Sequence, residues 1–410
     1  MADGRPKSWQ FLATPTAGQT VFQSWQESGS VPAGYGTWIT GTGTGFDAIT
    51  STPSMKYYDP AIGANGIWTG INNTAISIND KRGYMLYVRG DRTVTTASGT
   101  ANPTTLRTKG TLYQPANPPP VTNVLAGKLA AVGNPYASTI DLVYMKNNGL
   151  FVNLNNDVTV WDPLLTGSYN SGGYQSLSAA NNYEPTAGNT PSSYYPAGVP
   201  SSTIQSGQAF FVRSAGLAGS VSFTEACKVN TNRLVNRPPS TLSGRRYFRT
   251  TLYTSAGLIA DGNAVIFDQA FRNDIDADDT YKIENAGENF GLLRNGQSLA
   301  VEARHAIDLR DTVFFNMNNL RRQKYQLRFA PKNMQAVGLS AFFIDRFLGT
   351  SAPISLTDST VITFRVTVDP ASAFSERFYV ILVNGRNSLM YSNVTYRTGR
   401  DKKKHNVQGL

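Results

Sequence analysis

Residues 82–89, RGYMLYVR, and residues 206–213, SGQAFFVR, decide the fold of this chain. Each stretch has a glycine near its start, an aromatic and aliphatic run behind it, and an arginine at its end. Short apolar runs bounded by turn residues are typical of buried strands. The glycine allows the chain to enter such a strand where another backbone lies close. Because the same pattern occurs at two distant places, it indicates a β unit that is present twice.

Three further pairs of segments support the duplication, because they occur in the same order in both halves. Each half has an apolar segment that stops at a proline, an aromatic–Asp–Pro turn and a Gly-x-aromatic entry. Asp–Pro starts a turn through the Asp side chain and the fixed proline φ. The pairs are 9–15 (WQFLATP) with 129–135 (LAAVGNP), 58–60 (YDP) with 161–163 (WDP), and 66–68 (GIW) with 172–174 (GGY).

The remaining sequence is also typical of strands and turns. Residues 361–368 alternate between apolar and polar side chains, which predicts a strand with one buried face. Residues 378–383 form a continuous apolar run, which is typical of a strand that is buried on both faces. Gly and Pro interrupt the chain too often for long helices. We therefore expect an all-β protein of consecutive β-sandwich-like units, the first two related by internal duplication.

Two proline clusters, at residues 118–120 and 238–239, predict the boundaries of these units. Proline removes a hydrogen-bond donor from a sheet, so such clusters do not lie inside one. With 410 residues the chain is long enough for two or three domains. We predict β unit 1 at 1–117, β unit 2 at 121–235, a distinct β-sandwich domain at 240–395 and a basic tail at 396–410.

Composition and charge exclude several classes of protein. Charged residues make up only 16% of the chain and hydrophobic residues 40%, so the chain is not a disordered one. About half of the formal net charge of +10 lies in residues 386–410, and no nucleic-acid-binding module accompanies it. We therefore expect no nucleic-acid partner. No run of 18 apolar residues predicts a membrane span, and residues 1–6 lack the apolar core of a signal peptide.

The sequence contains no recognisable catalytic motif. Cys227 is the only cysteine, which excludes an internal disulfide and a zinc site with several thiolates. It is interpreted as a small buried side chain, because neither His305 nor His405 lies in a catalytic context. No Gly-x-Ser-x-Gly, His-Glu-x-x-His or phosphate-binding loop occurs. Carboxylates such as Glu284 and Glu302 leave sugar hydrolysis open as an alternative, since sequence does not place two of them together.

The sharpest local cluster of acidic residues is 273–279, NDIDADD. The carboxylates of Asp274, Asp276 and Asp278 alternate along the chain and could supply oxygen ligands to Ca²⁺. The spacing begins like an EF-hand loop, then departs from it, since the sixth position is Asp279 and not Gly. The alternative interpretation is an acidic surface turn. Calcium is therefore the one cofactor that the sequence suggests.

A tyrosine-rich stretch between residues 169 and 195 suggests a binding loop. Tyr183, Tyr194 and Tyr195 are its candidate contact residues, among Ser, Gly, Asn and Pro. Tyrosine offers a broad apolar face and a hydroxyl at low entropic cost, which suits sugars or a partner surface. In the alternative interpretation these side chains fold back onto their own sandwich.

The second unit resembles secreted proteins of Bacteroidota that are exported by the type IX secretion system. The first unit carries a companion phrase, and the third resembles the β domain that often precedes the sorting domain of such proteins. The C-terminal sorting domain itself is absent here. The segments that carry the resemblance are 132–141 (VGNPYASTID), 160–163 (VWDP), 204–212 (IQSGQAFFV), 82–92 (RGYMLYVRGDR), 343–346 (FIDR) with 349–350 (GT), and 376–380 (ERFYV).

The resemblance implies an extracellular or outer-surface location more strongly than it implies an activity. It also implies O-glycosylation at Asp-Ser/Thr followed by a small or apolar residue, which Thr312 and Ser359 satisfy. We therefore expect a non-catalytic, adhesive or structural surface protein that could form filaments through cell-surface or self-association partners. The alternatives are a carbohydrate-binding module or appendage of a glycan-degrading system, and a secreted hydrolase.

Overall fold

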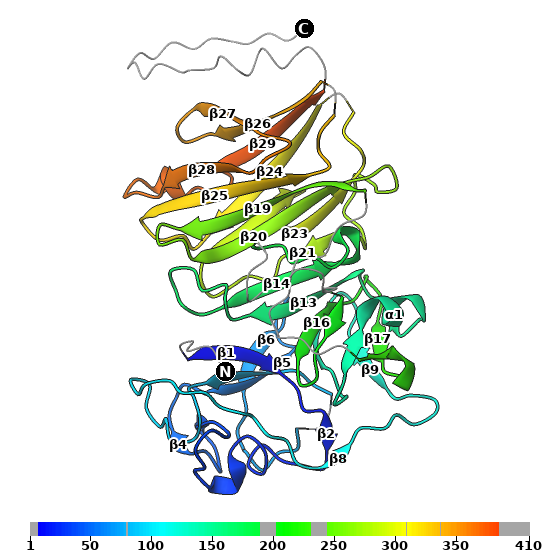
Figure 1. The fold of residues 1–410 in the computed structure, drawn as a ribbon, viewed down its shortest axis with the longest axis vertical. Helices are drawn as coiled ribbons and strands as arrows, with labels where there is room; N and C mark the ends of the chain where they lie inside the picture. The colour runs from blue at the N-terminus through cyan, green and yellow to red at the C-terminus, as the bar shows by residue number, and fades with distance from the viewer. Residues whose placement is uncertain are drawn as a thin grey trace.

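The computed structural model describes residues 7–78, 81–188, 202–230, 244–308, 310–336 and 338–384. The described residues fold almost entirely into strands, and the one α-helix among them, α1 (Leu142–Asn147), has six residues. Figure 1 shows three β units stacked along the long axis, from the blue unit 1 through the green unit 2 to the yellow and orange unit 3. The expected all-β fold is confirmed.

Unit 1 is built on a four-stranded antiparallel sheet with the order β1-β7-β5-β6. Val21, Trp25, Ile39 and other buried residues of the long connections cover one face of this sheet. Short strand pairs tie the connections together. The strands of the main sheet are β1 (Ser8–Leu12), β5 (Met55–Asp59), β6 (Ile67–Gly70) and β7 (Tyr84–Val88), and the short ones are β2 (Thr16–Ala17), β3 (Thr40–Gly41), β4 (Ala48–Ile49) and β8 (Thr111–Leu112).

Unit 2 is built on a second four-stranded sheet with the order β10-β16-β13-β14. Two three-stranded sheets and α1 enclose its own core, which includes Tyr136, Phe210 and Cys227. The main strands are β10 (Leu129–Gly133), β13 (Asp157–Asp162), β14 (Gly173–Ser178) and β16 (Ala209–Arg213). The small sheets contain β9 (Val121–Val124), β12 (Phe151–Val152) and β17 (Gly219–Ser222), and β11 (Thr139–Asp141), β15 (Thr203–Ile204) and β18 (Lys228–Val229).

The main sheets of units 1 and 2 have the same strand order when their strands are matched as the sequence pairs suggest. In unit 1, Tyr58 of β5 lies opposite Trp68 of β6, and in unit 2, Trp161 of β13 lies opposite Tyr174 of β14. In each pair, the first aromatic residue belongs to the aromatic–Asp–Pro segment of its half and the second belongs to the Gly-x-aromatic segment.

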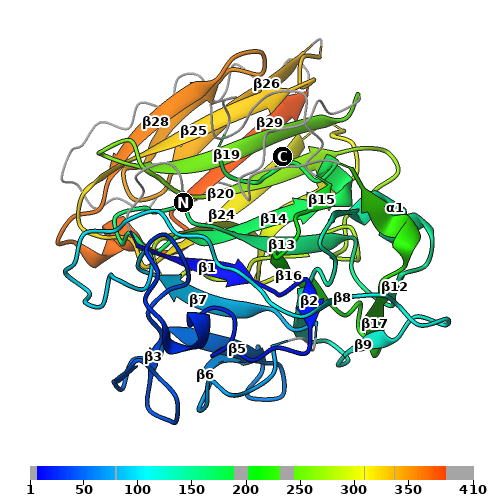
Figure 2. The ribbon, with the colours of Figure 1, turned by 60° about the horizontal axis from the view of Figure 1, so that its bottom comes forward.

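The two sheets pack face to face through aromatic and small side chains. Phe11, Tyr58 and Phe211 are buried between them, and Trp161 Nε1 donates a hydrogen bond to the Trp9 carbonyl at 2.8 Å. The ends of the strands also interlock, since the Ala13 amide donates to Gly207 and the Gly133 amide to Lys81. Figure 2 shows the blue sheet beneath the green one. Units 1 and 2 therefore share a core layer.

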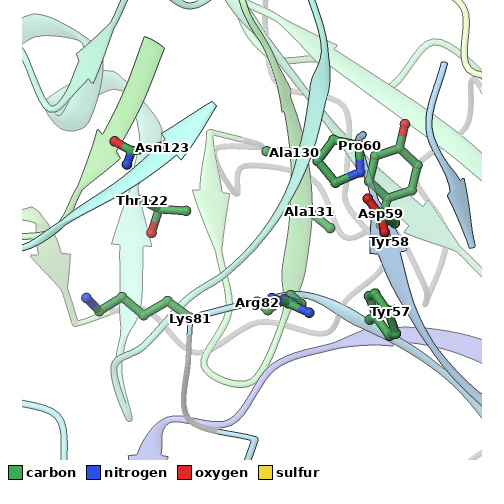
Figure 3. A pocket seen from close by; sticks show the side chains of 10 residues that line it. All are labelled: Tyr57, Tyr58, Asp59, Pro60, Lys81, Arg82, Thr122, Asn123, Ala130 and Ala131. Atoms are coloured by element: carbon green, nitrogen blue, oxygen red, sulfur yellow. The ribbon is translucent and has the colours of Figure 1, made fainter. Parts of the chain in front are cut away.

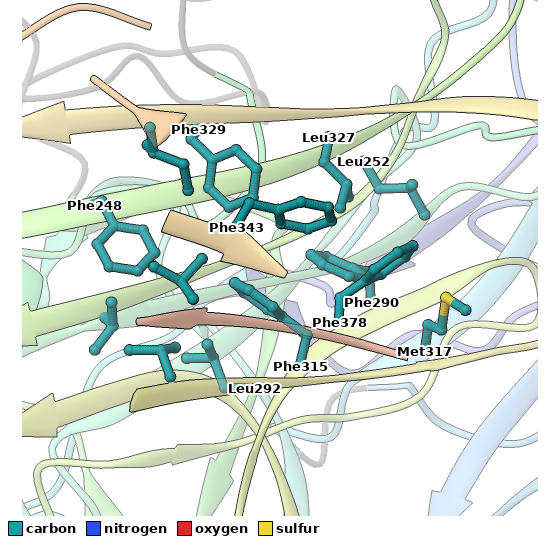
Figure 4. Close-up of a cluster of buried hydrophobic side chains, with 14 of the residues drawn as sticks. Phe248, Leu252, Phe290, Leu292, Phe315, Met317, Leu327, Phe329, Phe343 and Phe378 are labelled. Carbon is teal, nitrogen blue, oxygen red and sulfur yellow. The ribbon is translucent and has the colours of Figure 1, made fainter. Parts of the chain in front are cut away.

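Unit 3 is one 11-stranded sheet that folds over itself. Strands from distant places in its order meet: Phe329 of β25 contacts Phe343 of β26, and Phe364 of β28 contacts Phe378 of β29. Figure 4 shows Phe329, Phe343 and Phe378 inside the core. The strands are β19 (Arg246–Thr254), β20 (Ile259–Phe267), β21 (Thr280–Tyr281), β22 (Asn289–Arg294), β23 (Gln297–Arg304), β24 (Arg310–Asn318), β25 (Lys324–Lys332), β26 (Leu339–Asp345), β27 (Thr350–Ile354), β28 (Thr360–Arg365) and β29 (Phe378–Asn384).

The interface between units 2 and 3 is closed by a second apolar cluster and by a buried ion pair. Ala180 of unit 2 packs against the outer face of β19, β20 and β23. Glu184 of unit 2 accepts hydrogen bonds from Arg249 and from the Tyr247 hydroxyl, each at 2.8 Å. The side chains of Glu184 and Arg249 are 1% and 5% exposed. Every pairing between named strands stays within one of the three predicted units.

Candidate functional site

A hollow with mixed aromatic and polar walls lies where the three units meet, and we call it the aromatic cleft. Its volume is about 450 Å³, which lies in the range of small-molecule sites. Units 1, 2 and 3 each contribute one wall. Its lining residues are Tyr58, Asn65, Gly66, Ile67, Trp68, Leu129, Tyr174, Phe211, Arg213, Tyr281, Lys282, Ile283, Glu284, Gln297 and Ser298.

The floor and two walls of the aromatic cleft come from the facing sheets of units 1 and 2. Tyr58 and Phe211 are buried and meet edge to face, with ring centroids 4.8 Å apart. Trp68 and Tyr174 are half-buried, and the Trp68 Nε1 donates a hydrogen bond to the Tyr174 hydroxyl at 2.8 Å. The Tyr58 hydroxyl donates to the Asn65 carbonyl. This network fixes the aromatic rings before a ligand arrives.

Unit 3 supplies the third wall through the segment that follows β21. Lys282 forms a buried ion pair with Asp261 at 2.6 Å, which satisfies its charge inside unit 3. Glu284 is exposed, and its carboxylate accepts a hydrogen bond from the Asn318 amide at 3.0 Å. The backbone amide of Tyr174 donates to the Asn285 side chain at 2.7 Å. That hydrogen bond ties the third wall to the aromatic wall.

Arg213, the last residue of β16, is the cation that unit 2 places in the aromatic cleft. Its guanidinium stacks on Tyr281, 5.1 Å from the ring centroid. No carboxylate of the described residues forms a salt bridge with it. Burial raises the pKa of Tyr58 to about 12, and the charge of Arg213 opposes that rise. Arg213 therefore brings positive charge close to the cleft floor.

A second hollow of about 300 Å³ lies between units 1 and 2, and we call it the basic hollow. Tyr58 lines both the basic hollow and the aromatic cleft. In Figure 3, Lys81 and Arg82 lie along one side, while β9 contributes Thr122 and Asn123 at one end. Arg82 stacks on Tyr57, and the Asp59 carboxylate accepts from the Ala61 amide within its own turn. The side chains of Ala130 and Ala131, which also line the hollow, are too short to fill the space between these walls.

The predicted calcium ligands are not brought together. Asp276 caps its own turn by accepting the Asp278 amide at 2.9 Å, and Asp278 accepts from Asn156 of unit 2 at 2.7 Å. Asp274 is exposed. Across the ranges described above, no group of three or more His, Cys, Asp or Glu side chains is arranged to hold a metal ion. The segment instead contributes to the contact between units 2 and 3, and the calcium prediction has no ligand set here.

Of the three tyrosines predicted as contact residues, the structure describes only Tyr183. Tyr183 is 4% exposed and packs into the core of unit 2, so its prediction as a contact residue is wrong. Its φ of 59° turns the chain sharply after Asn182 and directs the ring inward. Tyr194 and Tyr195 lie outside the described residues. Tyr174, which belongs to the same tyrosine-rich stretch, does line a cleft.

Both candidate glycosylation residues lie in unit 3. Ser359 is exposed in the turn before β28, and Thr312 is half-buried within β24, opposite Ile381. Glycosylation of these residues remains a prediction. Cys227 is buried in the core of unit 2, where burial raises the pKa of its thiol to about 11. A thiol of that pKa is mostly protonated at neutral pH, which agrees with the interpretation of Cys227 as a packing residue.

Sequence reasoning named Glu284 as a candidate carboxylate and included Tyr174 in the tyrosine-rich stretch, but it did not bring together the residues that line either hollow. Arg213 ends one of the two repeated segments, so the repeat itself marked its position, but nothing in the sequence indicates that Tyr281 of unit 3 lies beneath it. Arg82 is the first residue of the other repeated segment, and Lys81 lies directly before it. The feature of the sequence that could have indicated the two hollows is the pair of repeated segments, because cationic residues of both hollows lie at the ends of these segments.

Comparisons with known proteins give no match. No protein-family model, no curated protein and no solved structure matches this chain. Among the helices that the structure describes, none has the length and apolar character needed to span a membrane.

Proposed function

We propose that this chain is a non-catalytic surface protein that acts outside the cell as a rigid adhesive or structural module. The observation that carries the proposal is the position of the two hollows at junctions between units. The aromatic cleft takes walls from all three units, and the basic hollow takes walls from two. Both sites therefore exist only when the units are held in one arrangement, which suits a protein whose rigidity presents a binding surface.

The interfaces supply that rigidity. The layer between units 1 and 2 contains interlocking aromatic rings, including Phe11, Trp68 and Phe211 within 5.0 to 5.6 Å of one another. The interface between units 2 and 3 contains the buried Glu184–Arg249 pair. Removing one side chain from such a network lowers the stability of the interface, because it leaves an unfilled cavity or a buried charge without its partner. The exterior location itself rests on the resemblance to type IX secretion substrates.

We propose in addition that units 1 and 2 arose by internal duplication. The identical strand order of the two main sheets supports this, as does the equivalent placing of the Tyr58–Trp68 and Trp161–Tyr174 pairs. A pair of related units that pack through the same face resembles a dimer joined into one chain.

The proposed function is tested on the cells that make the protein. Antibody labelling of intact cells should detect the chain without permeabilisation, and deletion of its gene should lower attachment to surfaces in a flow chamber. Restoring the gene should restore attachment. Labelling that requires lysis, attachment unchanged by deletion, or robust turnover in a screen of glycan and ester substrates would contradict the proposal.

A further inference from the structure

The polar groups of the aromatic cleft include both hydrogen-bond donors and acceptors. Arg213 and the amide of Gln297 can donate, while Glu284, the Gln297 amide oxygen and the Ser298 hydroxyl can accept. A sugar hydroxyl both donates and accepts, so it uses a mixed set of this kind. A phosphodiester offers acceptors and no donors, so it has nothing to donate to Glu284, whereas an acidic sugar carries hydroxyl donors for Glu284 beside its own carboxylate. The mixture therefore favours a polyhydroxylated ligand over a nucleic acid.

The aromatic rings provide the complementary apolar surface. Trp68, Tyr174 and Tyr281 are half-buried, so part of each side chain faces outward, and each lines the cleft. Trp68 and Tyr174 are held by their mutual hydrogen bond and by edge contacts with Phe211, so little side-chain entropy remains to be lost on binding. Rigid aromatic side chains of this kind are effective contact surfaces for a ring-shaped ligand.

More positively charged than negatively charged side chains line the two hollows. Lys81 and Arg82 line the basic hollow with Asp59, whose carboxylate is engaged in its own turn. Lys282 is compensated by Asp261, whereas Arg213 has no salt bridge with any described carboxylate. Because a guanidinium presents a planar fork of donors that matches a carboxylate, Arg213 is suited to bind an acidic group.

We propose that the aromatic cleft binds an acidic oligosaccharide, with sugar rings on Trp68 and Tyr174 and a sugar carboxylate on Arg213. This inference rests on the proposed adhesive function, for which it names the ligand class. Tyr58 lines both the aromatic cleft and the basic hollow, which carries two further cations, Lys81 and Arg82. Binding is non-covalent and weakens as salt screens these contacts.

Isothermal titration calorimetry of the full chain with two hexasaccharides tests the inference. One ligand is a hexamer of galacturonic acid, and the other is maltohexaose, which carries no charge. The acidic ligand should bind about tenfold more tightly or better, since a charge-assisted hydrogen bond accounts for a factor of that size. The variant Arg213→Gln should remove most of that preference and leave the affinity for maltohexaose within about threefold. Arg213→Lys should give an intermediate value, because it keeps the charge and loses the planar fork.

The control variant is Arg365→Gln, which removes an exposed arginine from β28 of unit 3, outside the residues that line both hollows. It should bind both sugars like the unchanged chain, and circular dichroism melting confirms that each variant is folded. Equal affinity for the two sugars, or no effect of Arg213→Gln, overturns the acidic preference. Tighter binding of a single-stranded hexanucleotide, or failure of both sugars to bind, overturns the carbohydrate assignment. Surface labelling and attachment of the gene-deletion strain then decide the proposed function separately.

Discussion

Gly133 ends β10 at a place where unit 1 lies directly against unit 2. A Cβ added there would lie 2.3 Å from the Cβ of Ala13, so one of the two sheets would have to shift. We expect Gly133→Ala to lower the free energy of unfolding by about 1–3 kcal/mol, as overpacking of a filled core does. Urea denaturation followed by tryptophan fluorescence measures this, because Trp9, Trp68 and Trp161 report on the same layer.

Gly99 provides the matched control for that substitution. The nearest neighbours of a Cβ added there are the Thr96 hydroxyl at 3.2 Å and Val94 Cγ1 at 3.3 Å, which need to move by only a few tenths of an ångström. Gly99→Ala should therefore change stability by less than about 0.5 kcal/mol. If both alanine variants were equally stable, the close approach of the two sheets would be wrong.

Asp157 makes stability depend on pH in a direction opposite to that of most carboxylates. Burial raises its pKa from 3.8 to about 7, and the charge of Arg213 opposes part of that rise. The folded state therefore holds a proton that the unfolded chain releases between about pH 4 and pH 7. The stability from this group is complete below that window and is lost as pH rises through it, by about 1 kcal/mol per pH unit.

The variant Asp157→Asn isolates this contribution. Asp279, whose pKa burial raises to about 6, adds a slope of the same sign, so the informative quantity is the difference between the variant and the unchanged chain. That difference, measured by urea unfolding, should be small at pH 4 and should favour the variant at pH 8. An equal difference at both pH values would show that Asp157 has an ordinary pKa.

At the scale of elements, the Glu184–Arg249 pair joins the segment after β14 to strand β19. Glu184→Gln should lower the free energy of unfolding by about 3–5 kcal/mol, because it leaves Arg249 buried without a countercharge. The exposed pair of Lys228 and Glu225 is the control, since its side chains are 33% and 58% exposed. Glu225→Gln should cost less than about 1 kcal/mol. Similar losses for the two variants in urea unfolding would contradict the role given to the interface.

The sequence predicted strands well where the apolar pattern is dense. The run 84–88 coincides with β7, and the run 378–383 coincides with all of β29 except its last residue. In a chain that Gly and Pro interrupt this often, a short strand is the element that can bury such an apolar run. The alternating run 361–368 was predicted too long. Strand β28 ends at Arg365, and Val368, assigned to the buried face, is 77% exposed.

The sites were harder to predict because they depend on contacts between units. The repeat indicated that Trp161 and Tyr58 occupy equivalent turns, but not that the two sheets face each other across them. Tyr183 was assigned to a loop surface by its polar neighbours, yet it packs into the core after a turn in which both Asn182 and Tyr183 have positive φ. Local composition does not contain that information, because the direction of a side chain at a turn is set by the backbone.

At the scale of the whole molecule, the three units differ in how far they are self-sufficient. Unit 3 encloses a large aromatic and aliphatic core of its own. Unit 1 has a smaller core, and the second face of its sheet is buried mainly against unit 2. Both hollows would lose a wall if the units separated, so their shape depends on all of the interfaces between units.

The dependence of unit 1 on unit 2 gives the last prediction. Cutting the chain between Asn117 and Pro118 leaves every strand pairing of the named elements intact. A fragment of residues 1–117 produced alone exposes Phe11, Tyr58 and Met85, so it should aggregate or stay unfolded. Produced together with residues 118–410 it should be soluble and should co-purify in a one-to-one complex, as size-exclusion chromatography with light scattering will show. The substitution Phe211→Asp in the larger fragment places an unpaired charge in the shared layer and should abolish the complex. A soluble, folded 1–117 fragment that does not bind the remainder would mean that the two sheets are separate domains, and the junction hollows would then have no fixed walls.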